Sequence, residues 1–239
     1  MAGSVGNITT DIIKNGLVFN MDAANRASYI GTGTNVNDTV SQTTGSLRGG
    51  VGFEDVNFGI FDFDGTDEDI LISSDFGNGY SAITLSSWIK VDAFQTSIEA
   101  IFGKDDNPRA SGNFYFGIQK GSSTSSGNLR FLLLAPSQDA LDTSSNSLNI
   151  DTWYNIVCTW DSDNMVIYLN GVLSANSSTT NATGTLGSLS DPFYIGQSGY
   201  SESTERFDGS IGPTHIYNRA LPANEVLHNY NALKGRFGL

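Results

Sequence analysis

The stretch from Trp153 to Leu173 constrains the fold more than any other part of the chain. Its sequence, WYNIVCTWDSDNMVIYLNGVL, places an extended apolar run before the polar residues 161–164 and a second run over Met165–Leu169. Asn170 and Gly171 then suit a type I′ turn, because both central residues of such a turn need a positive φ. The segment therefore predicts two antiparallel strands followed by a tight hairpin turn.

The composition is that of one all-β domain. A chain of 239 residues can form a single large β domain, and 38% hydrophobic with 11% aromatic residues supply a sandwich core. Ser, Thr, Asn and Gly dominate the remainder, which is typical of many short strands joined by turns. We therefore expect an N-terminal arm over 1–15, a β-sandwich over 16–235 and a C-terminal tail over 236–239.

Apolar alternation predicts where the other strands lie. We expect strands over Gly16–Met21, Phe58–Phe63, Ile70–Ser73, Ile83–Val91, Ile98–Gly103, Phe114–Gln119, Leu129–Leu134, Phe193–Gly196 and Gly209–Tyr217. The stretch Gly31–Gly52 lacks periodicity and is expected to be a long surface loop. One short helix is expected from Pro222, with Lys234 and Gly235 as its stop.

Charge and cysteine content exclude several classes of partner and compartment. A formal net charge of −13 argues against nucleic acid, because phosphates would be repelled over most of the surface. No apolar run approaches the ~20 residues of a transmembrane helix, and the N-terminus lacks the basic start and apolar stretch of a Sec signal peptide. Cys158 is the single cysteine, so no internal disulfide forms, which is consistent with assembly in a reducing cytoplasm.

Four motifs resemble the laminin-G and pentraxin branch of the concanavalin A-like jelly rolls. They are the Phe-Asp-Gly turn at 63–65, the Trp153 strand with its Leu-Asn-Gly hairpin, the Ile-Gly at 195–196, and IYNRALPANEV before the final helix. The resemblance covers Gly16 to Gly235. It implies an all-β, concanavalin A-like (laminin-G-like) two-sheet jelly-roll sandwich with one short C-terminal helix. The resemblance implies that the function is binding or assembly, as is usual for such domains, and less often catalysis.

Catalysis is the least supported of the functions that this fold hosts. Its glycosidases carry Glu-X-Asp-X-Glu, which places two carboxylates on one strand face, and the motif is absent from this sequence. The acidic cluster over 62–69 matches the Phe-Asp-Gly turn instead, where the acids shape a turn. His215 and His228 have no recognisable nucleophile motif nearby. We therefore expect a protein that is not an enzyme.

The pentraxin resemblance implies a possible Ca²⁺ site. In pentraxins, an Asp-Asn pair after one strand and a Glu-Gln-Asp run in a later loop hold the ion. Here the loop after Gly103 offers hard oxygen ligands, while the later loop keeps its Gln but has lost the neighbouring acids. The alternative is a solvated acidic loop. The candidate ligands are Asp105, Asp106, Asn107, Gln197 and Glu202.

Glycan binding in such folds needs an exposed aromatic ring for stacking on a sugar face, beside polar side chains for the hydroxyls. Three tyrosines lie in Gly/Ser/Asn-rich loops and are the candidates: Tyr29, Tyr80 and Tyr200. The alternative is that each is an ordinary loop residue. The tryptophans lie in expected strands and are better assigned to the core or to the sheet faces.

The two ends of the chain suggest a more particular family. GLVFNMDAANRASYIGTG near the start and NYNALKGRFGL at the finish resemble laminin-G-like virion proteins of tailed bacteriophages, notably those of marine cyanobacteria. The resemblance implies a head decoration or a fibre/tail component, located in the virion and contacting capsid or tail proteins. Apolar side chains at both ends suggest burial against sister subunits, with a trimer slightly preferred. The candidate assembly residues are Ile8, Ile12, Ile13, Phe237 and Leu239.

Two functions remain open at this point. One is a virion structural protein whose arms dock on the shell or on other subunits. The other is a carbohydrate-binding lectin module that adheres to cell-surface polysaccharide, and one protein can serve both functions.

Overall fold

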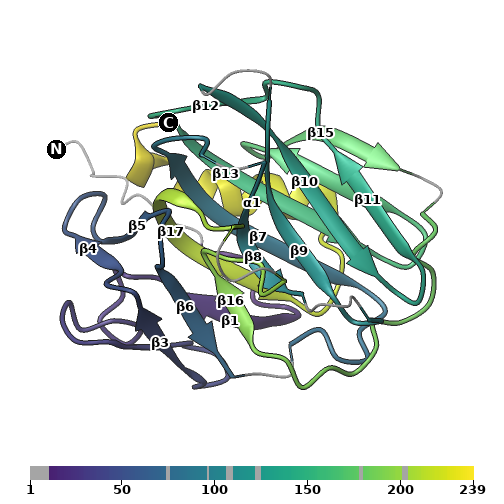
Figure 1. Cartoon of the computed structure of the whole chain (residues 1–239), viewed down its shortest axis with the longest axis horizontal. Helices are drawn as coiled ribbons and strands as arrows, with labels where there is room; N and C mark the ends of the chain where they lie inside the picture. The colour runs from purple at the N-terminus through teal and green to yellow at the C-terminus, as the bar shows by residue number, and fades with distance from the viewer. Residues whose placement is uncertain are drawn as a thin grey trace, which may run out of the picture.

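The computed structural model describes residues 11–73, 76–95, 97–105, 110–121, 125–177, 180–200 and 204–239. Figure 1 shows two β-sheets stacked face to face, with one short helix near the C-terminal end. Both sheets are antiparallel throughout the described part of the chain. Within the described ranges, the expected all-β sandwich of two sheets with one short α-helix near the C-terminus is confirmed.

The first sheet runs in the order β15-β14-β13-β7-β17-β5-β4, and β1 also pairs with β17. Its strands are β1 (Leu17–Met21), β4 (Gly52–Glu54), β5 (Ile60–Asp64), β7 (Ile83–Val91), β13 (Trp153–Trp160), β14 (Met165–Leu169), β15 (Val172–Ser177) and β17 (Asp208–Tyr217). Neighbouring strands are far apart in sequence at β13-β7-β17. The central part of this sheet therefore forms only when distant segments meet.

The second sheet runs in the order β11-β10-β9-β8-β16-β6-β3-β2, and β12 also pairs with β10. Its strands are β2 (Asn35–Asn37), β3 (Thr44–Arg48), β6 (Asp69–Ile72), β8 (Ile98–Lys104), β9 (Phe114–Lys120), β10 (Ser126–Leu134), β11 (Gln138–Asp142), β12 (Leu148–Asn149) and β16 (Phe193–Ile195). Helix α1 (Ala223–Leu233) and the 3₁₀ turn η1 (Lys234–Phe237) complete the described elements.

The core lies between the two sheets and follows the alternation of the strands. On β7, Ile83, Leu85, Ile89 and Val91 all face this core, as their period of two predicts. Trp160 is fully buried there, and its indole Nε1 donates to the Ala182 carbonyl at 2.8 Å. The expected turn at Asn170 and Gly171 is also present, with φ of 52° and 76°.

Helix α1 covers the outer face of the first sheet. Five buried residues from β13, β14, β17, the following loop and the helix form a second apolar cluster: Val157, Tyr168, Tyr217, Leu221 and Val226. The helix ends at Leu233 and continues as η1, and Gly238 closes that turn with a φ of 74°. The α-helix therefore ends at the expected stop, with Lys234 as its C-cap, and only the left-handed residue lies further on, at Gly238 after the 3₁₀ turn.

The C-terminal tail packs on its own domain. The Phe237 ring stacks on Trp88, with centroids 4.2 Å apart and planes at 12°, and it also lies 4.6 Å from the Trp153 ring. Phe237 is only 7% exposed, so the expectation that a single chain would expose it is wrong. Leu239 remains 48% exposed. The tail is part of the sandwich, and Leu239 is its one side chain left open for assembly.

Residues 11–15 also lie on their own domain. The Ile13 amide donates to Asn229 Oδ1 at 2.8 Å, and the Tyr217 hydroxyl donates to the Ile13 carbonyl at 2.9 Å. Burial raises the pKa of Tyr217 to about 12, so this hydroxyl keeps its proton at neutral pH. Ile12 and Ile13 are half-buried, and Ile8 lies outside the described residues.

Three parts of the strand prediction are wrong. The expected loop over Gly31–Gly52 contains β2 and β3 and reaches the first residue of β4. β3 pairs with β6, so cross-strand pairing overrides the low strand propensity of its Gly45. Strands β11 and β12 were not expected. The strand expected from Phe58 begins only at Ile60, which leaves Phe58 in a turn.

Among the described residues, no helix combines the length and the apolar character that a bilayer crossing would require.

His215 on β17 is a buried titratable group on the outer face of the first sheet. It is 3% exposed, and the charges that act on it are those of Asp22 and Arg236. Burial is the main cause that lowers the pKa of His215, to about 4, and the Arg236 charge lowers it further, while Asp22 opposes the shift. The imidazole is therefore neutral in the folded protein at neutral pH.

Because the folded pKa of His215 lies below the unfolded value of about 6.5, the unfolded chain binds the proton more tightly. The stability that neutral His215 contributes is complete above pH 6.5 and is lost as the pH falls through 4. Between pH 7 and pH 4 the free energy of unfolding should fall in both proteins. We expect the fall to be smaller in His215→Gln than in the parent, by up to about 3 kcal/mol. Urea unfolding at both pH values tests this, with His228→Gln as control. Equal losses in parent and His215→Gln would contradict it.

Candidate functional site

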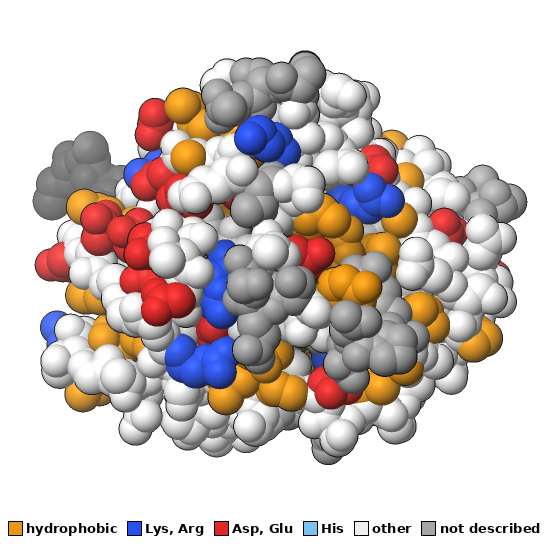
Figure 2. Space-filling view, in the orientation of Figure 1, with side chains coloured by type: hydrophobic (Ala, Val, Ile, Leu, Met, Phe, Trp, Pro, Cys, Tyr) orange, Lys and Arg blue, Asp and Glu red, His pale blue; other side chains and the backbone are white. Residues whose placement is uncertain are grey.

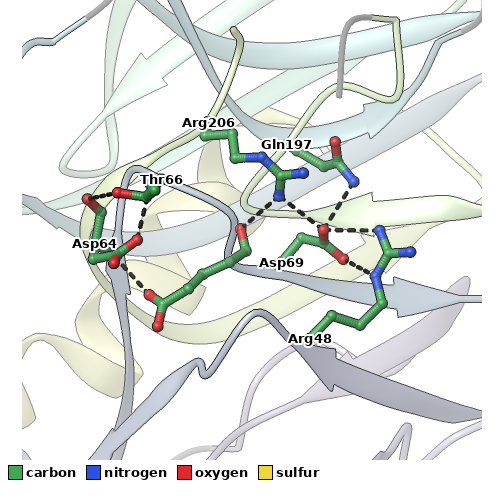
Figure 3. Close-up of polar contacts among 7 residues, drawn as sticks. Arg48, Asp64, Thr66, Asp69, Gln197 and Arg206 are labelled. Carbon is green, nitrogen blue, oxygen red and sulfur yellow. Dashed lines mark hydrogen bonds and ion pairs between the residues drawn. The ribbon is translucent and has the colours of Figure 1, made fainter. Parts of the chain in front are cut away.

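Asp69 at the start of β6 is the centre of a buried ion-pair network (Figure 3). Its carboxylate accepts from Arg48 Nε at 2.7 Å and Nη2 at 2.8 Å, from Arg206 Nη1 at 2.9 Å and from Gln197 Nε2 at 3.0 Å. Asp69 is 1% exposed, so removing one partner would leave a buried charge unpaired. The network ties Gln197 and Arg206 to β3 and β6.

The described residues of the two loops in the Ca²⁺ prediction meet at Asp105 and Ser198. The Asp105 amide donates to the Ser198 carbonyl at 3.1 Å. Gly103 allows this approach, because a Cβ there would lie 2.2 Å from the Ser198 carbonyl oxygen. Gln197 Oε1 is buried without a hydrogen-bond donor, while its Nε2 bonds to Asp69. A carbonyl oxygen without a donor can serve as a Ca²⁺ ligand.

The candidate Ca²⁺ ligands fit the ion in part. Asp106, Asn107 and Glu202 lie outside the described residues. Within the described ranges, no group of three or more His, Cys, Asp or Glu side chains is arranged to hold a metal. If the ion binds, Asp105 and Gln197 would hold it, and its charge would fasten the two loops to each other. The site remains a prediction.

The acidic cluster after β5 shapes a turn, as expected. Asp64 Oδ1 accepts from the Thr66 amide at 2.8 Å, Glu68 Oε2 accepts from the Asp64 amide at 2.6 Å, and Gly65 has a φ of 70°. Figure 2 shows acidic side chains gathered over β4 and β5. The pKa of Asp62 is raised, first by burial and then by the charges of Glu54 and Asp92. This flank of the molecule repels anions.

Tyr29, a candidate for glycan stacking, is a wall of a pocket and not an exposed platform. The side chain is 5% exposed, and its ring centroid lies 5.3 Å from those of Phe53 and Phe61. Its hydroxyl donates to the Gly33 carbonyl at 2.9 Å. The expectation that Tyr29 presents an open ring is therefore wrong, because aromatic packing draws the ring inward.

The other two candidate tyrosines lie elsewhere and are half-buried. Tyr80 packs against the core, its carbonyl accepts from the Leu186 amide at 2.9 Å, and burial raises the pKa of its hydroxyl. The amide of Tyr200 donates to Ser198 Oγ at 3.1 Å. The structure does not bring Tyr80 or Tyr200 into the pocket of Tyr29.

Phe58 is the exposed aromatic that sequence reasoning missed. It is 77% exposed, and no other Phe, Tyr or Trp in the described part of the chain is classed as exposed. Asn57, Phe58 and Gly59 have successive φ values of 48°, 66° and 124°. A positive φ is rare for a bulky residue, so this turn is strained. The Asn-Phe-Gly sequence before an apolar strand was the available signal, because Asn and Gly favour such turns.

Phe58 stands at the rim of a pocket of about 200 Å³ that the loops around Tyr29 and Phe53 enclose. The lining residues are Ala23, Ala24, Arg26, Tyr29, Ile30, Gly31, Phe53, Asp55 and Phe58. Arg26 Nη1 donates to the Ile30 carbonyl at 2.8 Å, and both Arg26 and Asp55 are exposed. One positive and one negative side chain balance each other. The pocket thus combines an aromatic surface with polar groups and no net charge.

A comparison with family models identifies the fold's relatives. Residues 64–227, more than half of the chain, match the Laminin_G_3 model, described as the concanavalin A-like lectin/glucanases superfamily. The chain belongs to this superfamily. The laminin-G-like resemblance of the sequence motifs is thereby confirmed. A search of curated protein sequences found no match.

Solved structures share the superfamily fold at low sequence identity. The binding domain of Paraclostridial Mosquitocidal Protein 1 is 19% identical, with a TM-score of 0.67 over 91% of this chain and 52% of that chain. The binding domain of botulinum neurotoxin DC in complex with SialylT is 16% identical, with a TM-score of 0.65 over 91% and 52%. This chain therefore spans about half the length of those toxin domains.

Domain 4 of AbnA, an extracellular arabinanase from Geobacillus stearothermophilus, is similar over its whole length. It is 17% identical, with a TM-score of 0.65 over 90% of this chain and 98% of that chain, and its structure holds arabinotriose. At these identities the likeness shows the fold alone. This chain and the solved structures therefore share the β-sandwich fold, and some of those structures are binding domains.

If Ca²⁺ binds at Asp105 and Gln197, it will stabilise the folded chain by mass action. At a concentration 100 times the dissociation constant, the gain is about 2.7 kcal/mol, which raises the melting temperature by roughly 5–10 °C for a chain of this size. Thermal melts in CaCl₂ and in EDTA test this, with Asp105→Asn expected to abolish the rise and MgCl₂ as a control. Superimposable melts of the parent would remove the site.

Proposed function

We propose that this chain is a non-enzymatic carbohydrate-binding module and that a sugar ring binds in the Tyr29–Phe58 pocket. The observation that carries the proposal is the 77% exposed Phe58 ring, which a strained turn holds beside a pocket of about 200 Å³. Strained backbone tends to occur where a protein presents a group to a ligand. The pocket is smaller than the 300–1,000 Å³ typical of drug-sized ligands, so one ring fills it.

The lining of the pocket favours a neutral sugar. The apolar C–H face of the ring stacks on Phe58, with Ile30 completing the apolar rim at 62% exposure. Arg26 donates to ring hydroxyls, and Asp55 accepts from them. Because the two charges cancel, the pocket itself favours no charged ligand. The acidic flank that begins at the neighbouring Glu54 disfavours sulfated or carboxylated sugars.

The superfamily comparison supports the same ligand class. The arabinanase domain that holds arabinotriose corresponds to this chain over nearly its whole length, so a complete module of this shape binds an oligosaccharide in that protein. The toxin domains support the proposal less, because this chain matches only about half of each. Binding domains among the neighbours also fit a module without catalytic activity.

Replacement of Phe58 by Ala should remove the stacking surface while leaving the core unchanged, because the side chain is exposed. By analogy with the stacking of bases on aromatic rings, about 1–3 kcal/mol of binding is lost, which is roughly a 5- to 150-fold rise in Kd. A panel of arabinotriose, maltotriose and cellotriose in isothermal titration calorimetry measures this. Phe58→Trp should retain affinity, and Leu173→Ala, an exposed apolar residue far from the pocket lining, is the control. Equal affinities of parent and Phe58→Ala would exclude the pocket.

A finer proposal concerns where the module is displayed. We propose that it is a virion structural protein of a tailed phage, as a head decoration or a fibre/tail component, in which glycan binding serves adhesion to cell-surface polysaccharide. The likeness of both chain ends to such virion proteins supports this. Leu239 and residues 11–13 lie on the surface or half-buried and are the described assembly candidates, in a homo-oligomer with a trimer slightly preferred.

Mass spectrometry of purified particles of the encoding phage tests the virion proposal. We expect the protein in particles at a copy number that is a multiple of three, and we expect a variant lacking residues 1–10 to fold but to be lost from particles. Residues 11–15 are retained in this variant because Ile13 and Asn15 bond to the sandwich. Absence of the parent protein from washed particles would contradict the virion role without affecting glycan binding.

A further inference from the structure

We propose that Arg236, near the C-terminal end, is the positioning residue of the Tyr29–Phe58 pocket: it joins the two loops that form the pocket and holds Phe58 in the orientation that a sugar ring meets. The inference rests on the proposed function. Arg236 is not among the lining residues, so it acts only through the loops it binds.

The Arg236 guanidinium donates to both walls of the pocket. On one side, Nη1 bonds to both carboxylate oxygens of Asp22 at 2.9 and 2.8 Å, and Asp22 begins the loop that continues to Gly31. On the other side, Nε donates to the Asn57 carbonyl and Nη2 donates to the Gly59 carbonyl at 2.5 Å. A planar fork with five donors can make all of these bonds at once, which the ammonium of Lys cannot do.

These bonds fall on the carbonyls that flank Phe58. Residues 57–59 all have a positive φ, and two of the three are not glycine. A backbone of this kind persists only where its surroundings over-determine it. The one backbone hydrogen bond across the turn is from the Gly59 amide to the Val56 carbonyl at 2.8 Å. The guanidinium therefore supplies much of what fixes the turn.

Arg236 is itself held in place by the C-terminal packing. Its side chain is 10% exposed, and the ring of the next residue, Phe237, packs on both Trp88 and Trp153. With its amide oriented to satisfy both groups, Asn57 donates to the Arg236 carbonyl at 3.1 Å and accepts from Trp153 Nε1 at 3.2 Å. The turn that carries Phe58 is thus fastened to the outer face of the first sheet through the end of the chain.

The effect on affinity depends on the fraction of molecules in which the turn has the conformation that binds sugar. If the turn adopts the binding conformation in only one molecule in ten, the apparent Kd rises tenfold, although no residue that touches sugar has changed. Loss of Arg236 should therefore weaken binding and leave the pocket lining intact. Removal of the Arg236 guanidinium would also leave the Asp22 carboxylate without its ion-pair partner, which lowers stability. The free energy of unfolding of each variant therefore has to be measured separately.

The test uses the whole chain with Arg236→Met and Arg236→Lys. The matched control is Arg130→Met, which removes the ion pair between Arg130 and Asp142 on the second sheet. Amide NMR spectra of residues 56–59 are recorded without sugar. Affinities for arabinotriose, maltotriose and cellotriose are measured by calorimetry, at a temperature where melting curves show each variant folded. We expect Arg236→Met to shift the 56–59 signals and to raise the Kd at least tenfold, Arg236→Lys to lie between it and the parent, and Arg130→Met to match the parent.

The outcomes separate this inference from the proposed function. If Phe58→Ala weakens binding but Arg236→Met keeps both the parent Kd and the parent 56–59 signals, the positioning role is wrong and the pocket stands. If Phe58→Ala leaves binding unchanged, the pocket is not the sugar site, and the inference falls with it. If Arg236→Met fails to fold, Arg236→Lys is the deciding variant. NMR signals and an affinity equal to those of the parent would show that the guanidinium of Arg236 is not required to position the turn.

Discussion

The apolar layer between the two sheets is the constraint on which the rest of the molecule depends. Cys158 is buried and unpaired, so no disulfide joins the sheets, and alternating side chains such as Ile83 and Leu85 hold them together. Every described strand therefore packs one face against the core. What remains for recognition is the outer faces and the loops, and α1 already covers part of one outer face. Binding chemistry is consequently expected in loops that the sandwich positions.

Two buried carboxylate–guanidinium clusters in this fold fasten such segments. Asp69 with Arg48 joins Arg206 to the second sheet, and Arg236 with Asp22 fixes the turn at 57–59 against the first. In both cases a carboxylate is paired with a guanidinium whose remaining donors reach backbone carbonyls. The arrangement satisfies the buried charges with charge-assisted hydrogen bonds.

The sequence predicted those elements whose own residues determine them. The Trp153–Leu173 hairpin formed as expected, because alternation and the Asn-Gly turn are local signals. β3 was missed because its stability comes from pairing with β6, which no local pattern reveals. Phe58 was assigned to a strand, since its aromatic ring suits one. Asn57 and Gly59 on either side of it were a local turn signal. The distant contact with Arg236 that holds the turn lies beyond what a single sequence displays.

The separation of Arg236 from the turn it binds has a consequence for protein engineering. The two are 179 positions apart in sequence, yet the turn's conformation depends on both. A loop-grafting experiment that transplants only residues 53–59 into another sandwich would carry the Phe58 side chain without the partner that fixes its backbone. A working transplant would need three separate pieces: the loop around Tyr29, the Phe58 turn, and a guanidinium donor arriving from the far end of the host chain.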